Sequence, residues 1–278
     1  MSVAPDLRSL KGRLDRFVRG NSSTEAVLLR RLLDEHFGRF DRVGIIGGLV
    51  RDFARGGRQA FKSDLDLVVE GDRKEVARLA QAVGARGNRF GGYGFTAGPW
   101  KIDFWALEDT WAVAQGHVAV RGLDDVVRCT FFDWDAIVYD LRTWRLICDP
   151  AYLERLRSRR LDISLRSNPG ELGNLLRAAR RIVSWNLQPG PALRLFIEEQ
   201  LDESAFQSIV ASERRKYPGR VLDRFAGAEQ LRTYLLSPRS ATTERARQMV
   251  LPLERLSQRD SRLLVVGQPR SRARMSDV

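Results

Sequence analysis

The chain has 278 residues, 43% of them hydrophobic, which is enough for one large or two modest domains with buried cores. Its 47 Lys and Arg against 35 Asp and Glu give a formal charge of +12, which favours a polyanionic partner, although an arginine-rich composition alone produces the same balance. Two cysteines and two histidines are too few for a disulfide framework or a histidine metal centre. The sequence has no apolar run of membrane-spanning length and no secretion signal, so we expect a cytoplasmic protein that does not enter a membrane.

Residues 1–40 are predicted to be mainly helical. One helix is expected over Leu7–Val18, and a second is expected to follow a cap at Ser23 or Thr24. Apolar residues recur at helical spacing along the second helix and predict that it packs on a sheet; they are Val27, Leu28, Leu32 and Phe37.

The most informative stretch begins with a strand that ends in two glycines. Val43–Ile46 is a short apolar run, Gly47 and Gly48 follow it, and Leu49–Arg55 has helical character. Such a turn lets backbone N–H groups approach a polyphosphate, because glycine has no Cβ and a helix N-terminus favours negative charge. Arg51, one turn into the helix, is placed to add a phosphate contact.

Two aspartates follow on the next predicted strand. Asp64 and Asp66 share one face of this strand, while Leu65 and Leu67 share the other. Two adjacent carboxylates are suited to Mg²⁺, although the same pattern also fits a solvated strand face. The glycine turn upstream makes the functional interpretation the stronger one.

A third aspartate lies in a predicted hairpin formed by 90–96 and 100–107. On its second strand Lys101, Asp103 and Trp105 share one face, opposite three apolar side chains. An unpaired buried carboxylate is costly, so Asp103 requires edge exposure, a salt bridge to a lysine, or a functional role.

The remaining elements follow from apolar spacing. In the first half we expect helices over 73–83 and 123–128, a helix or turn over 108–116, a short strand over 118–120, and a strand pair over 129–141 and 144–148. From 151 onward the pattern is helical, with helices expected over 151–160, 170–187, 192–199, 203–216, 226–236 and 242–255, before a basic tail.

The order Gly-Gly-x-x-Arg-Asp at 47–52 and Asp-x-Asp at 64–66 resembles the head domain of the polymerase β nucleotidyltransferase superfamily, specifically its tRNA CCA-adding and bacterial poly(A) polymerase branch. The resemblance implies an α+β fold whose head has a mixed or antiparallel sheet with flanking helices, followed by an all-helical neck and C-terminal domain. We expect the divisions to be 1–40 for the N-terminal helical segment, 41–150 for the head, 151–264 for the neck and C-terminal domain, and 265–278 for a flexible basic tail. The body and tail domains of the family would need more chain than remains here.

The resemblance also implies the site. Asp64, Asp66 and Asp103 would be the catalytic carboxylates and would hold two Mg²⁺ ions. Gly47, Gly48 and Arg51 would hold the triphosphate, while Asp52 would brace the turn.

Two motifs depart from the family pattern. The family usually has the motif Arg-Arg-Asp-Phe-Thr-Ile-Asn-Ala, and the corresponding segment of this chain ends in Asp135-Ala136. Asp135 therefore stands where the family has an asparagine that contacts the nucleotide. The family neck motif Leu-Arg-Ala-x-Arg is matched around Arg177 and Arg180; with Arg181 these face nucleotide phosphate or RNA, or else form a solvated surface. The base-reading motif Glu-Asp-x-x-Arg is represented by Gly170, Glu171 and Asn174, so C-then-A specificity does not carry over.

The resemblance therefore implies a template-independent RNA nucleotidyltransferase that uses Mg²⁺ and ATP or CTP, with RNA, specifically tRNA, as its partner. An alternative keeps the chemistry and changes the acceptor to another RNA, a protein or a small molecule. A third alternative is a degenerate head that only binds RNA.

Overall fold

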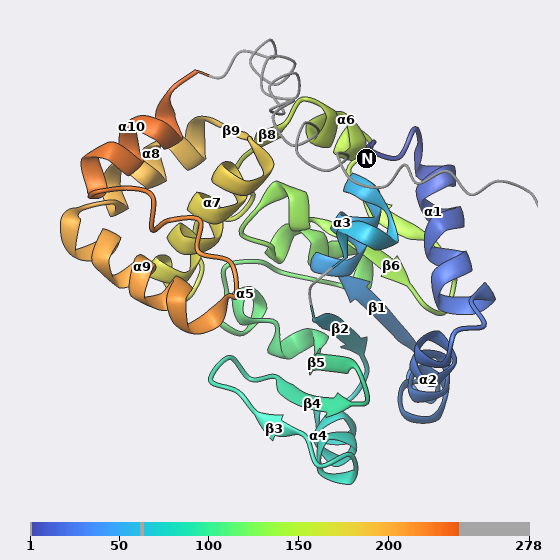
Figure 1. The fold of residues 1–278 in the computed structure, drawn as a ribbon. Helices are drawn as coiled ribbons and strands as arrows, with labels where there is room; N and C mark the ends of the chain where they lie inside the picture. Colours follow the sequence, from blue (N-terminus) through green and yellow to red (C-terminus); the bar gives the residue numbers. More distant parts are fainter. Residues whose placement is uncertain (1, 62–63, 239–278) are drawn as a thin grey trace, which may run out of the picture. The chain divides into compact units, whose positions relative to one another are not determined.

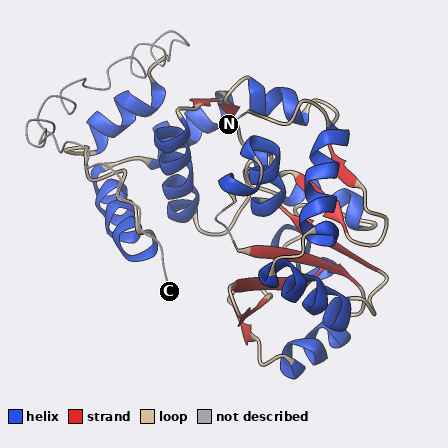
Figure 2. Ribbon diagram, turned by 45° about the vertical axis from the view of Figure 1, so that its right-hand side comes forward, coloured by secondary structure: helices blue, strands red, loops and turns tan. Residues whose placement is uncertain are grey.

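The structure is a computed structural model that describes residues 2–61 and 64–238 (Figure 1). The predicted helix over 242–255 and the basic tail lie outside the described residues. The described part has the predicted α+β architecture, with a mixed sheet and flanking helices (Figure 2). None of its helices has both the length and the apolar character needed to cross a membrane.

The main sheet has seven strands in the order β3-β4-β5-β2-β1-β6-β7. Strands β2 and β5 are parallel, and every other neighbouring pair is antiparallel. A parallel pair requires a crossover, which α4 and the β3–β4 segment supply. The strands span Arg42–Ile46 (β1), Leu65–Glu70 (β2), Arg86–Gly87 (β3), Tyr93–Ala97 (β4), Trp100–Ala106 (β5), Ile137–Asp140 (β6) and Leu146–Cys148 (β7).

The predicted helices of the first half are present. Ser23 caps α2 as expected, since its hydroxyl accepts from the backbone N–H of Ala26. Helices α1 and α2 each continue into a π-helical turn, over Arg16–Gly20 and Leu33–Phe37. The helices span Leu7–Asp15 (α1), Thr24–Leu32 (α2), Gly48–Gly56 (α3), Arg73–Ala82 (α4) and Trp111–Ala114 (α5).

Two strand predictions in the first half were wrong. Residues 118–120 form no strand; instead the carbonyl oxygen of Ala112 accepts from the N–H groups of His117 and Val118, which ends α5 in a tight turn. The strand predicted from 129 begins only at Ile137, because Asp133–Asp135 form a 3₁₀ turn in front of it.

Between 151 and 238, the described part of the second half, the structure consists of helices, connecting loops and one short strand pair. Helix α7 contacts α8, α9 and α10. The all-helical expectation is corrected by β8 (Arg160–Leu161), which pairs in parallel with β9 (Gln188–Pro189). The helices span Tyr152–Arg157 (α6), Glu171–Trp185 (α7), Pro191–Gln200 (α8), Glu203–Lys216 (α9) and Ala228–Leu236 (α10).

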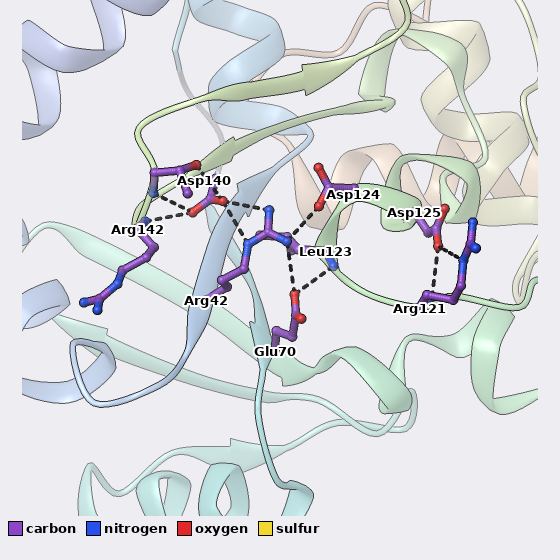
Figure 3. A network of polar contacts seen from close by, with 9 residues as sticks. Arg42, Glu70, Arg121, Leu123, Asp124, Asp125, Asp140 and Arg142 are labelled. Atoms are coloured by element: carbon purple, nitrogen blue, oxygen red, sulfur yellow. Dashed lines mark hydrogen bonds and ion pairs between the residues drawn. The ribbon is translucent and has the colours of Figure 1, made fainter.

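An ion-pair network joins the adjacent strands β2, β1 and β6 at one end of the sheet (Figure 3). Arg42, at the start of β1, donates to Asp140 of β6 at 2.8 Å and to Asp124 at 2.7 Å. It also lies 3.6 Å from Glu70 at the end of β2, and Glu70 in turn accepts from the backbone N–H of Leu123. The network therefore fixes the strand end opposite to the one that carries the glycine turn.

Candidate active site

The sheet register brings the sequence-predicted residues to one end of the sheet. Strands β1 and β2 are antiparallel with Ile45 opposite Leu67, so the turn that follows β1 and the start of β2 lie at the same end. β6 also begins at this end, because Gly47 donates its N–H to the carbonyl oxygen of Ile137 at 3.1 Å. Asp64, Gly47 and the turn before β6 therefore lie at the same end of the sheet.

Asp66 and Asp103 are direct partners on adjacent strands. The parallel pairing of β2 and β5 places Asp66 opposite Asp103, and Asp64 lies two residues before Asp66. Strand alternation puts all three carboxylates on the same face, with buried Leu65 and Ile102 behind them. The structure thus brings together the three aspartates that the sequence singled out.

The three carboxylates repel one another electrostatically. Partial burial, followed by the charges of Asp103 and Asp64, raises the pKa of Asp66 from its ordinary value of 3.8 to about 7. Burial also raises the pKa of Asp103, partly offset by Lys101. The backbone of Asp66 is paired in the sheet, but its carboxylate makes no hydrogen bond or ion pair with any described residue and is therefore available to a ligand.

Lys101 lies among these carboxylates and was not predicted as a site residue. Its ammonium group forms an ion pair with Asp64 and lies 3.9 Å from Oδ2 of Asp103. The sequence analysis considered a lysine salt bridge as one explanation for Asp103, and this contact is part of its environment. The position of Lys101 two residues before Asp103 could have predicted this contact, because residues two apart on a strand share a face.

The donor set fits magnesium in its chemistry. Three aspartates provide hard oxygen ligands. Their negative charges repel one another, and a bound divalent cation would reduce this repulsion. As the side chains stand, however, no three His, Cys, Asp or Glu residues in 2–61 and 64–238 are arranged as a metal site. The assignment of Asp64, Asp66 and Asp103 to catalysis and to Mg²⁺ therefore stays a prediction.

The glycine turn has the backbone geometry that its sequence predicts. Gly47 has φ +67° and ψ −113°, a conformation that only glycine adopts readily, and Gly48 begins α3. The carbonyl oxygen of Gly47 accepts from the N–H of Arg51 at 2.8 Å and so starts the helix. This turn leaves the first N–H groups of α3 without partners inside the helix.

Arg51 and Asp135 pair with each other inside the protein. Nη1 of Arg51 lies 2.6 Å from Oδ1 of Asp135, its Nε lies 3.0 Å from Asp52, and its side chain is 7% exposed. Asp135 also accepts from Arg181 of α7 at 2.8 Å. The bracing role of Asp52 agrees with this geometry, while contacts of Arg51 and Asp135 with a nucleotide stay predictions.

The three neck arginines have different surroundings. Arg180 pairs with buried Glu213 of α9 and donates to the carbonyl oxygen of Gly219 at 2.7 Å. Arg181 is paired with Asp135, and Arg177 is exposed beside Asn174. Among these three, Arg177 has the guanidinium that remains accessible to a ligand.

An aromatic and cationic cluster, also missed from the sequence, joins α3 to α7. Trp185 stacks on Trp134 with ring centroids 6.1 Å apart. The guanidinium groups of Arg55, Arg51 and Arg181 lie 4.2, 5.3 and 5.7 Å from the centre of the Trp185 ring. This cluster packs the neck helix against the helix that follows the glycine turn.

The fold can be compared with those of known proteins. A CCA-adding enzyme in complex with ATP matches 89% of this chain and 60% of its own, with a TM-score of 0.51 and 18% sequence identity. The chain therefore has the fold of this CCA-adding enzyme over the matched residues. A CCA-adding enzyme with CTP matches 89% of this chain and 59% of its own at a TM-score of 0.49 and 19% identity. The Bacillus stearothermophilus enzyme with CTP matches 74% and 55% at a TM-score of 0.45 and 16% identity.

The chain spans 48% to 60% of the length of the solved structures described as CCA-adding or tRNA-processing enzymes that it matches. No protein-family model matches the sequence, and no curated protein matches it. The comparison therefore establishes the fold, and the chemistry rests on the residues described above.

Proposed function

We propose that this chain is a Mg²⁺-dependent nucleotidyltransferase that transfers a nucleoside monophosphate from an NTP to an acceptor hydroxyl. The pairing of Asp66 with Asp103 across β2 and β5 carries the proposal. This pairing places two carboxylates side by side at the sheet end that also holds the Gly47 turn. Carboxylates for a divalent cation, next to free backbone N–H groups, suit a bound triphosphate.

In the proposed mechanism each part of the site has one task. Asp64, Asp66 and Asp103 would hold the Mg²⁺ ions, which when bound neutralise triphosphate charge and favour ionisation of the acceptor hydroxyl. The Gly47 turn leaves room for the phosphates to approach the backbone. The acceptor oxygen forms a bond to the α-phosphorus while the bond from that phosphorus to the pyrophosphate oxygen breaks, and the acceptor proton passes to solvent.

For the acceptor, we propose an RNA 3′-hydroxyl, as in CCA addition to tRNA. The likeness to the CCA-adding enzyme with ATP supports this choice, and so does the charge of +12. Arg177 of α7 is exposed and is therefore available to a phosphate group of the nucleotide or RNA.

One observation favours a second acceptor class. Asn174, at a base-reading position of the family, is buried and donates to Asn168 at 3.0 Å, and Glu171 is paired with Arg166 at 3.0 Å. Both side chains therefore already have partners within the protein, Asn174 in the interior and Glu171 at the surface. Another RNA, a protein or a small molecule is therefore the alternative acceptor.

Label transfer tests the proposal. Each of four α-labelled NTPs is incubated with Mg²⁺ and with tRNA lacking its 3′ end, total RNA, or a cell protein and metabolite fraction. Transfer of CMP and AMP to the truncated tRNA would support the CCA-type activity. Label in another acceptor would favour the alternative.

Matched variants connect the activity to the site. Asp66→Asn should abolish transfer, while Asp34→Asn, which changes an exposed carboxylate in the Leu33–Phe37 turn, should leave it unchanged. Full activity of the Asp66 variant would refute the mechanism. Salt-dependent RNA binding with no label in any acceptor would favour the RNA-binding module.

A further inference from the structure

Lys101 occupies a position between the carboxylates of two strands. It lies two residues before Asp103 on β5, so both side chains share a face. Its ammonium pairs with Asp64, which precedes β2, and lies 3.9 Å from Asp103. A lysine ammonium is cationic at neutral pH, so Lys101 brings one positive charge to these carboxylates.

The charge balance of the cluster is incomplete with Lys101 alone. One ammonium faces the carboxylates of Asp64, Asp66 and Asp103, and the carboxylate of Asp66 has no hydrogen-bonding partner among the described residues. A single positive charge therefore leaves net negative charge at this sheet end. A divalent cation would balance it more fully than the lysine does.

We propose that Lys101 is a resident counter-cation, whose ammonium holds the space between Asp64 and Asp103 that a divalent metal ion would take. The inference rests on the proposed function, in which the three aspartates bind Mg²⁺. Metal binding then requires the lysine to release Asp64, and Lys101 sets the metal affinity of the site.

The geometry makes this exchange feasible. The Lys101 side chain is 58% exposed, and its four-carbon stem can turn the ammonium into solvent without moving the strand. A monovalent and a divalent cation cannot share the same carboxylate oxygens, because their repulsion at about 4 Å is strong outside bulk water.

Binding of Mn²⁺ alone, measured by electron paramagnetic resonance of the free ion, tests the proposal without nucleotide or catalysis. Lys101→Gln should bind Mn²⁺ at least about fivefold more tightly than the unmodified protein. Lys101→Arg keeps the charge and should bind like the unmodified protein. Lys74→Gln makes the same charge change at an exposed site on α4 and should also have no effect.

The result for Asp66→Asn separates failure of this inference from failure of the proposed site. If Asp66→Asn weakens Mn²⁺ binding but Lys101→Gln leaves it unchanged or weaker, the metal site stands and the counter-cation role is wrong. If Asp66→Asn binds Mn²⁺ like the unmodified protein, or if no variant binds it, the metal site and the counter-cation role are both wrong. Thermal unfolding of each variant confirms that it is folded.

Discussion

Arg181 of the neck helix α7 donates to both carboxylate oxygens of Asp135, at 2.8 and 3.2 Å. Asp135 also accepts from Arg51 of α3, so one carboxylate serves two largely buried guanidinium groups. Burial alone would raise the pKa of Asp135, but Arg181 and Arg51 outweigh it and hold that pKa well below its usual range. Ionised Asp135 thereby joins the neck helix to the helix after the glycine turn.

Replacing Asp135 by Asn should therefore destabilise the fold strongly. The variant leaves two buried guanidinium groups that repel each other without their shared carboxylate, and breaking a buried ion pair in this way costs about 3–5 kcal/mol. Urea unfolding measures the loss. Glu154→Gln, which removes an exposed partner of Arg157, is the control and should cost less than about 1 kcal/mol. Equal stability of the two variants would contradict the structural role of Asp135.

The sequence predicted the parts of the site that depend on local pattern. A strand, two glycines and a helix are recognisable from spacing, and strand alternation placed Asp64 and Asp66 on one face. The family resemblance led us to expect Asp103 beside Asp64 and Asp66, but the pairing of Asp66 with Asp103 was not predicted, since spacing alone does not fix which strands become neighbours.

The other contacts were not predictable because they join distant segments. Helical spacing placed Arg177, Arg180 and Arg181 together on one helix, but the structure gives them different surroundings, which depend on where α9 and the 133–135 turn pack. Glu213 lies 33 residues from Arg180 and Asp135 lies 46 residues from Arg181. The spacing of residues within one helix or strand cannot predict pairs that are so far apart in the sequence. The two short strands β8 and β9 were missed for the same reason.

A second prediction concerns the backbone of the turn. Gly47→Ala should destabilise the protein by about 1–3 kcal/mol, because φ +67° with ψ −113° is strained for any residue with a Cβ. The added methyl group itself meets nothing closer than 3.8 Å, so the cost reports backbone strain. Gly12→Ala, inside α1 with open space around it, should instead stabilise by about 0.5–1 kcal/mol. Thermal unfolding compares the two, and a neutral Gly47 variant would exclude strain at the turn.

A third prediction follows from the raised pKa of Asp66. Because this pKa is about 7 in the folded protein and near 3.8 when unfolded, the folded state binds more protons between these values. Its stability should therefore fall as the pH rises from about 4 to 7. Asp66→Asn cannot ionise, so without metal it should gain stability over the unmodified protein on going from pH 4.5 to 8.

The full pKa change corresponds to about 4 kcal/mol, and sharing of the repulsion with Asp103 reduces the expected gain to about 1–3 kcal/mol. Urea unfolding in EDTA at both pH values measures it. Asp34→Asn, at an exposed site, should show the same difference from the unmodified protein at both values. An Asp66→Asn difference that does not change with pH would show that burial and the neighbouring carboxylates do not raise the pKa of Asp66.

A fourth prediction concerns the space beside Asp103. Gly94 of β4 lies opposite Asp103, and a Cβ at Gly94 would overlap Oδ1 of that carboxylate. Gly94→Ala should displace the Asp103 side chain and reduce transfer by about 10²-fold, because catalytic groups tolerate little misplacement. Stability should change by less than about 1 kcal/mol, since a half-exposed side chain can rotate away. Gly87→Ala, on neighbouring β3, is the control: a Cβ at Gly87 has no atom within 4 Å, so this variant should leave transfer unchanged. Equal transfer by both variants would show that Asp103 does not need its present position.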